Sequence, residues 1–239
     1  MTETRFSSRF GVAGCKPRDA SAETFSTRHL YLAKPAVDNG ILIGILPFGI
    51  AVSTPDLILT HALELFSARG YDAVGVQELV LAAGVTKPTL YHHFGNKEGV
   101  LEALIARDGR LLLTKLEAAT HYQRDLTLNL LAIVETYLAF ATTQTSFYRL
   151  LSACVVAPPE SRSYRLAYPI GRKQHALVET LFEAASRDHG NMRGRARRYA
   201  TSFIGLVHTY LRLILSGEIT PDDTLKYDIV KQFSYGIYS

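Results

Sequence analysis

From residue 53 to the C-terminus, apolar residues recur three and four positions apart, which is the spacing of one face of an α-helix. The first such face carries Ile58, Ala62 and Phe66. Thr54 is the expected hydroxyl cap of that helix, and Pro55 suits its first turn, where a backbone N–H would have no partner. Strand-like alternation between Asn-Gly or Asp-Gly turns does not occur in this part of the sequence. The pattern predicts an all-α fold.

Glycine and proline residues divide this part of the chain into further segments with helical spacing. Pro169 should kink or split the segment that contains it, because proline removes a backbone donor inside a helix. The longer helices are expected over residues 98–119, 124–143, 146–156, 160–188, 194–216 and 222–236.

Residues 1–52 differ from the rest, since the first 35 are rich in Ser, Thr, Arg and Ala and have no sustained period. An apolar stretch follows over residues 41–52, but Asp38 and Asn39 precede it, where a signal peptide would carry basic residues. We expect residues 1–52 to be a disordered leader that comes partly or wholly from a mis-assigned start. An internal start would need a non-ATG codon, for which Val52 is the natural candidate.

The composition excludes several classes of protein. Of the 239 residues, 47% are hydrophobic and 20% are charged, as in globular domains and unlike disordered chains. No apolar run approaches the roughly 18–20 residues that span a bilayer, so no membrane partner is expected. Cys15 and Cys154 are too few for a disulfide framework or, by themselves, a zinc site, which indicates a reducing, cytoplasmic environment.

Residues 54–100 contain three short helical segments, at about 54–69, 76–83 and 87–93. A turn at Gly84 separates the second from the third, and Thr86 is the expected cap of the third. Two helices joined by a short glycine-containing turn are typical of a helix-turn-helix, whose second helix enters the major groove of DNA.

The third of these helices has an unusual outer face. At 100° per residue, Leu90 and Phe94 share one side and should be buried. The opposite side carries proline, threonine, tyrosine and histidine, whereas a solvated helix or a protein-binding module would carry ordinary polar residues. Hydroxyl and imidazole groups can bind phosphate oxygens, and flat apolar surfaces can contact thymine methyl groups. Lys87 can reach a guanine edge, and Lys97, at the start of the fourth helix, can hold a phosphate.

Residues 84–98 (GVTKPTLYHHFGNKE) resemble the DNA-binding signature of the TetR family, the tetracycline-repressor-like transcriptional regulators, and the similarity covers roughly residues 54–104. Gly75 departs from the family pattern, in which Ser or Thr usually caps the second helix. Gln77 lies where family members commonly place a DNA-contacting side chain. The expected DNA contacts are Gln77, Thr86, Lys87, Pro88, Thr89, Tyr91, His92 and Lys97.

The resemblance implies a DNA-binding domain over residues 53–100 and a helical ligand-binding and dimerisation domain over residues 101–239. It also implies a homodimer that represses transcription from a palindromic operator in double-stranded DNA and responds to a small molecule. A regulator without a small-molecule effector, or an activator, is the alternative. The charge of the first domain argues against binding by bulk electrostatics, because residues 53–100 hold three basic and five acidic side chains.

Helices 194–216 and 222–236 are expected at the dimer interface. Helix 194–216 is apolar around most of its circumference, so it must be buried on more than one side. Packing inside the monomer is the alternative. The expected interface residues are Phe203, Val207, Tyr210, Leu225, Ile229 and Phe233.

A ligand pocket should lie among helices 98–119, 124–143, 160–188 and 194–216. Polar and aromatic side chains within their apolar faces are candidate contacts, although a satisfied core residue is the commoner role of each. These helices contain no cationic cluster, which favours a neutral or apolar effector over an anionic one. The candidate pocket residues are Tyr137, Tyr148, Cys154, His175 and His208.

The sequence predicts neither an enzyme nor a cofactor or metal site. His92 and His93 diverge by about 100° on a helix and cannot share a metal ion. The chain has no His-Glu-x-x-His, no Gly-x-Ser-x-Gly and no phosphate-binding Gly-Lys-Ser/Thr motif.

Overall fold

The computed structural model describes residues 37–38, 41–42, 44–45 and 51–236, all within one unit, Pro35–Ser239. The expectation of a disordered leader over residues 1–52 falls mostly outside these residues. The part that is described forms two short antiparallel pairs, in which Val37 faces Leu42 and Gly44 faces Val52. The strands are β1 (Val37–Asp38), β2 (Ile41–Leu42), β3 (Gly44–Ile45) and β4 (Ala51–Val52).

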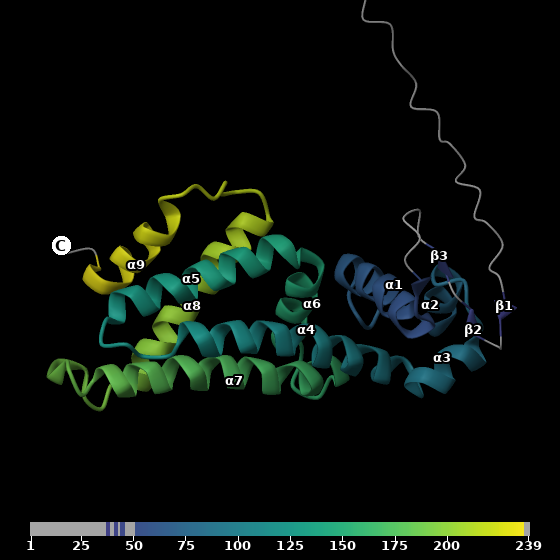
Figure 1. Cartoon of the computed structure of the whole chain (residues 1–239), viewed down its shortest axis with the longest axis horizontal. Helices are drawn as coiled ribbons and strands as arrows, with labels where there is room; N and C mark the ends of the chain where they lie inside the picture. Colours follow the sequence, from purple (N-terminus) through teal and green to yellow (C-terminus); the bar gives the residue numbers. More distant parts are fainter. Residues whose placement is uncertain (1–36, 39–40, 43, 46–50, 237–239) are drawn as a thin grey trace, which may run out of the picture. The chain divides into compact units, whose positions relative to one another are not determined.

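Beyond these strands the described chain is helical, which confirms the all-α prediction (Figure 1). The first three helices are α1 (Thr54–Arg69), α2 (Val76–Ala82) and α3 (Lys87–Phe94). The longer ones are α4 (Lys97–Ala119), α5 (Leu126–Thr143), α6 (Thr145–Val155), α7 (Arg162–Ala185), α8 (Ala196–Leu215) and α9 (Leu225–Tyr235), with a 3-10 turn at Gly190–Met192.

Two local expectations need correction. The cap of α1 is Ser53 rather than Thr54, because the Ser53 hydroxyl accepts a hydrogen bond from the Asp56 N–H at 3.3 Å. Pro169 does not split its helix, since α7 continues through it. Helix α7 packs against α4 and α6, and this packing stabilises it despite the backbone hydrogen bond that the proline cannot make.

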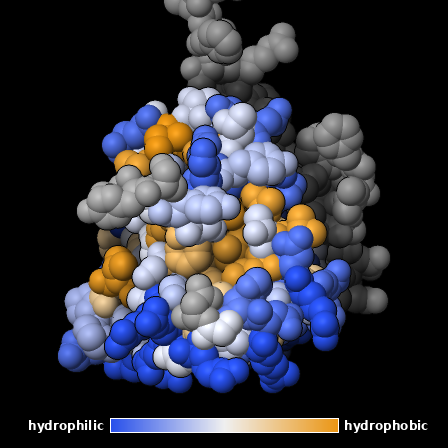
Figure 2. Space-filling model, turned by 90° about the vertical axis from the view of Figure 1, so that its left-hand side faces the viewer, coloured by the Kyte–Doolittle hydropathy of each residue, from blue (hydrophilic) through white to orange (hydrophobic). Residues whose placement is uncertain are grey.

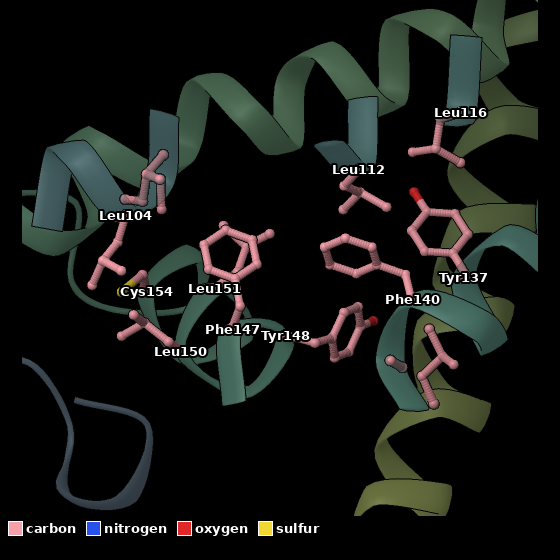
Figure 3. Close-up of a cluster of buried hydrophobic side chains, with 14 of the residues drawn as sticks. Leu104, Leu112, Leu116, Tyr137, Phe140, Phe147, Tyr148, Leu150, Leu151 and Cys154 are labelled. Atoms are coloured by element: carbon pink, nitrogen blue, oxygen red, sulfur yellow. The ribbon is translucent and has the colours of Figure 1, made fainter. Parts of the chain in front are cut away.

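The hydrophobic core runs between α4, α5 and α6 (Figure 3). Leucines of α4 face the aromatic rings of α5 and α6, and the rings of Phe140 and Phe147 meet edge to face with their centres 6.1 Å apart. Helix α6 also packs against α1, and α7 packs against α4. At that second crossing Gly109 is needed for close approach, because a Cβ there would lie 3.2 Å from Ile170. Helices α4 and α6, which contribute to the core, therefore also contact the first three helices.

Helix α5 is long and apolar enough to cross a membrane by length and composition, which the sequence reading did not anticipate. It has one charged residue, Glu135, in 18 positions. In the structure it is a core helix, because Ile133, Tyr137 and Phe140 are completely buried against neighbouring helices.

Helix α9 folds back onto α5 and α8. The Phe233 ring lies 4.9 Å from that of Phe203 and 5.9 Å from that of Phe182, and Lys226 pairs with Glu135 at 3.2 Å. The end of the unit where α9 lies shows apolar side chains framed by hydrophilic ones (Figure 2). Helix α9 thus covers one side of α8 within the same subunit.

Candidate nucleic-acid interface and effector pocket

The turn between α2 and α3 is held by backbone geometry. Gly84 has φ +64°, in the left-handed region that favours glycine, and the Val85 N–H donates to the Val80 carbonyl at 2.9 Å. Thr86 then caps α3, as expected, by accepting a hydrogen bond from the Thr89 N–H. The start of α3 is therefore set before any partner binds.

The outer face of α3 is free within the described structure. Leu90 is completely buried and Phe94 is half-buried, so they anchor the helix as expected. The predicted contacts Lys87, Pro88 and His92 are exposed, and Tyr91 is 45% exposed. Gln77 and Thr86 are exposed next to them, whereas Thr89 is half-buried. One side of α3 is therefore exposed and could enter the major groove of DNA.

Lys97 is placed differently from the other predicted contacts. It is half-buried, and its ammonium group donates hydrogen bonds to the carbonyls of Tyr71 at 3.1 Å and Val74 at 3.0 Å. The same group lies over the Tyr71 ring, 4.2 Å from its centre. Asn96 caps α4 by accepting a hydrogen bond from the Gly99 N–H at 2.9 Å. Lys97 therefore joins the start of α4 to the loop between α1 and α2.

Glu78 compensates for the weak Gly75 cap of α2, a role that the sequence reading missed. Its carboxylate accepts a hydrogen bond from the Gly75 N–H at 3.2 Å and pairs with Arg69. These contacts hold the pKa of Glu78 below its usual value, with the Gly75 hydrogen bond as the main cause. The spacing of glutamate three residues after a cap was the available signal.

The electrostatics of this domain leave one basic side chain for DNA. Among residues 53–100, Arg69 pairs with Glu78 and Lys97 binds carbonyls, whereas Lys87 is exposed and has no ion pair. Binding here would rely on neutral donors and shape more than on ion pairs.

A pocket of about 770 Å³ lies between α6, α7 and α8. Three of the five candidate pocket residues line it: Tyr148, His175 and His208. The Tyr148 hydroxyl and His208 Nδ1 form a hydrogen bond, and their rings stack with centres 6.0 Å apart. Burial lowers the pKa of His208 to about 4 and raises the pKa of Tyr148, so both are neutral near pH 7.

The other two candidates are buried and do not line the pocket. Tyr137 is completely buried, donates a hydrogen bond to Gln174 at 2.8 Å, and meets the His208 ring edge to face at 5.2 Å. Cys154 is buried in the core and does not line this pocket, and burial raises the pKa of its thiol to about 11. Gln174, which does line the pocket, was missed, although a glutamine on the buried face of α7 was a readable signal.

The sequence shows no cationic cluster in the helices expected to form the pocket, but two arginines from different helices reach it. Arg149 and Arg212 both line it. Arg149 donates a hydrogen bond to the Leu215 carbonyl at 2.9 Å, whereas Arg212 is exposed. They come from different helices, so their proximity is invisible in the sequence.

The residues expected at a dimer interface divide into two groups. Phe203, Val207 and Ile229 are buried to 1% exposure or less within the subunit and form part of its own core. Tyr210, Leu225 and Phe233 are half-buried. Apolar periodicity predicts burial but does not distinguish a neighbouring helix of the same chain from one of a partner.

Among residues 51–236, no group of three or more His, Cys, Asp or Glu side chains could hold a metal ion. Cys15 and the proposed start at Val52 lie where the structure describes no side chains.

Comparison with known proteins gives consistent results. The family model described as bacterial regulatory proteins, tetR family, matches residues 58–104. The transcriptional activator FasR of Mycolicibacterium smegmatis is 29% identical over 181 residues, which cover 75% of this chain and 80% of FasR.

Solved structures share the fold. The TetR-family regulator PfmR of Thermus thermophilus aligns with a TM-score of 0.60 and 21% identity, covering 76% of this chain and 99% of PfmR. The fatty acid degradation regulator FadR of Bacillus halodurans aligns with a TM-score of 0.64 and 17% identity, covering 76% of this chain and 98% of FadR.

Proposed function

We propose that this chain, which belongs to the TetR family of helix-turn-helix transcriptional regulators, acts as a ligand-responsive repressor. The regulators of this family are not enzymes. Its partners are a palindromic operator in double-stranded DNA, a second copy of the chain, and a small neutral or apolar effector. It works in the cytoplasm, where the chromosome lies.

The observation that carries the proposal is the free outer face of α3. Leu90 fixes the helix to the domain, while Pro88, Tyr91 and His92 stand exposed on the other side. A recognition helix contacts base edges and phosphates with such a face. Two copies related by a two-fold axis would read a palindrome, because the symmetry of the operator follows that of the protein.

The pocket between α6, α7 and α8 supports control by a ligand. Helix α6 packs on α1, and Arg162, in the first turn of α7, pairs with Glu98 in the first turn of α4. The walls of the pocket therefore contact the DNA-binding domain directly. A ligand that fits one arrangement of α6 and α7 better than another would shift the population of DNA-competent dimers.

The test is selection of bound fragments from the source genome, followed by titration of candidate apolar compounds against the protein–DNA complex. We expect one enriched palindromic sequence and release of the protein by its effector. Tyr91→Ala serves as the control for contact through α3. Failure to enrich any sequence would refute the proposal.

Activation of transcription is the second candidate, and the similarity to the activator FasR favours it. A reporter gene that carries the selected operator in its native position shows whether the protein represses or activates transcription. Deletion of the protein raises expression if it represses and lowers expression if it activates.

A further inference from the structure

The pocket between α6, α7 and α8 contains a hydrogen-bond donor without a protein partner. Gln174 lines the pocket from α7 and is only 4% exposed. Its Oε1 accepts the hydrogen bond from Tyr137, so the amide nitrogen is its other end, and this nitrogen has no partner among the described residues. In the same part of the chain, the only fully enclosed side-chain polar atom without a hydrogen bond is Asn129 Oδ1. The Gln174 nitrogen is therefore not fully enclosed, and the pocket is the space that it faces.

His208 supplies a second such donor from α8. Its Nδ1 is hydrogen-bonded to the Tyr148 hydroxyl, whereas Nε2 has no partner in the described structure. Burial raises the pKa of Tyr148, and a hydrogen bond that its oxygen accepts from Ser152 opposes this rise. The proton of the Tyr148 hydroxyl is thus available to His208 Nδ1. A neutral imidazole that accepts at Nδ1 carries its own proton on Nε2, so Nε2 is a donor.

Tyr137 brings the two donors to the same part of the pocket. Its hydroxyl bonds to Gln174, and its ring meets the His208 ring edge to face with the centres 5.2 Å apart. Tyr137 and Tyr148 extend from the neighbouring helices α5 and α6 (Figure 3). Four helices therefore position Gln174 Nε2 and His208 Nε2, which we call the donor pair.

The surroundings of the donor pair favour an uncharged acceptor. His208 is neutral near pH 7, because burial lowers its pKa to about 4. Of the arginines that line the pocket, Arg149 bonds to the Leu215 carbonyl and Arg212 is exposed to solvent. A carboxylate buried at the donor pair would lack a cation, which is costly. No carboxylate of the described residues lines the pocket, so a cationic ligand would lack a counter-ion as well.

We infer that the pocket takes a mostly apolar molecule with one carbonyl oxygen, and that the donor pair binds this oxygen. The inference rests on the proposed function in taking the pocket as the effector site, and it narrows the effector to carbonyl compounds such as ketones, esters and amides. A carbonyl oxygen has two lone pairs for the two donors, whereas a hydrocarbon would leave both donors unpaired. The hydrocarbon part of the ligand contacts the apolar lining, which includes Leu151, Val155, Ile204 and Leu215.

The first experiment compares three ligands of one shape by calorimetry, with the full chain and without DNA. The probes are 2-acetonaphthone, 2-ethylnaphthalene and 2-naphthoate, which carry a ketone, no acceptor and a carboxylate. The ketone should bind about tenfold or more tightly than the hydrocarbon, and more tightly than the carboxylate. Equal affinity for ketone and hydrocarbon, or no binding of the ketone, overturns the inference. Tighter binding of the carboxylate also overturns it, because the arginines would then hold the polar group.

The second experiment removes each donor and measures the ratio of ketone to hydrocarbon affinity, in which a general change of the pocket cancels. His208→Phe keeps a ring but lacks Nε2. The double variant Tyr137→Phe/Gln174→Leu removes the amide without leaving the Tyr137 hydroxyl unpaired. Each should lower the ratio at least about threefold, and the double variant is compared with Tyr137→Phe, which keeps the amide. An unchanged ratio in either donor variant that keeps the wild-type melting temperature overturns the inference.

The control is Thr136→Val, which should keep the wild-type ratio. Its hydroxyl neighbours Tyr137 in the sequence but donates to the Ala132 carbonyl at 2.8 Å and does not line the pocket. A fall of the ratio in this variant equal to that in His208→Phe would overturn the assignment to the donor pair.

Infrared spectroscopy of carbonyl-labelled 2-acetonaphthone gives a direct readout of the hydrogen bonds. The bound ketone should absorb at a lower frequency than in hexane, and the shift should shrink in both donor variants. A frequency equal to that in hexane overturns the inference. Protein that shows the shift but enriches no DNA fragment would refute the proposed function and leave the donor pair standing. Enrichment of an operator without selectivity for the ketone would do the reverse.

Discussion

The ammonium group of Lys97 lies 4.2 Å from the centre of the Tyr71 ring and donates a hydrogen bond to the Tyr71 carbonyl at 3.1 Å. Together with the bond to Val74, this contact ties α4 to the loop that precedes α2. The lysine that the sequence offers as a phosphate contact is thus also an internal brace of the DNA-binding domain. Its two roles can be separated by experiment.

Replacement of Lys97 by alanine should destabilise the domain by about 1–3 kcal/mol, because two half-buried carbonyls lose their donor. Operator binding should weaken as well, while dimerisation remains. Thermal unfolding and fluorescence anisotropy measure the two effects. A Lys97→Ala variant with unchanged stability but weaker binding would show that the side chain leaves its internal partners to contact DNA.

Gly99 should not tolerate alanine. A Cβ at this position would overlap the carbonyl oxygen of Phe94, the last residue of α3, so the backbone between α3 and α4 must move. We expect Gly99→Ala to weaken operator binding by moving the recognition helix, measured by anisotropy. The matched control is Gly205→Ala, where the added methyl group would meet no atom within 4 Å apart from the backbone of its own helix. Equal operator affinity of the two variants would contradict this reading.

Tyr91 should contribute to DNA binding and not to stability. It is 45% exposed, and its hydroxyl has no hydrogen-bond partner among the described residues. Tyr91→Ala should therefore weaken operator binding by roughly 1–2 kcal/mol at an unchanged melting temperature. Tyr91→Phe distinguishes the contribution of the hydroxyl from that of the ring.

Lys87→Ala should relax base preference more than it lowers non-specific affinity.

The dependence of operator affinity on salt should be shallow. Lys87 is the only basic side chain of residues 53–100 without an internal partner, so few counterions are released on binding. A plot of log Kd against log salt should have a slope of about 4 or less for the dimer. A slope near 8 or above would show that basic residues elsewhere in the chain contact the duplex.

Stability should fall in mild acid because of His208. Burial lowers its pKa to about 4 in the folded protein, whereas an unfolded histidine titrates near 6.5. Between these values the unfolded state binds more protons, so stability is fully present above about pH 6.5 and is lost as the pH falls towards 4, by up to about 3 kcal/mol. Denaturant unfolding at several pH values measures this loss. His208→Gln should flatten the profile in this window, and an unaltered profile would assign the effect to another group.

Local chemistry along the chain was enough to predict the helices and which side of α3 is exposed. Leu90 and Phe94 recur at helical spacing and Gly84 marks the turn, and such signals act between near neighbours in the sequence. The cap of α1 was misplaced by one residue, because Ser53 and Thr54 carry the same hydroxyl and only backbone geometry distinguishes them.

Contacts between segments that are far apart in the sequence could be identified only in the three-dimensional structure. Phe203, Val207 and Ile229 show apolar periodicity, but only the packing of α8 and α9 against α5, α7 and each other shows that they are buried within the subunit. Arg149 and Arg212 line one pocket from separate helices. Lys97 donates hydrogen bonds to the carbonyls of Val74 and Tyr71, which lie 23 and 26 residues earlier in the sequence. The helical spacing of apolar residues predicts that a side chain will be buried, whereas the residues it contacts depend on how the helices pack in three dimensions.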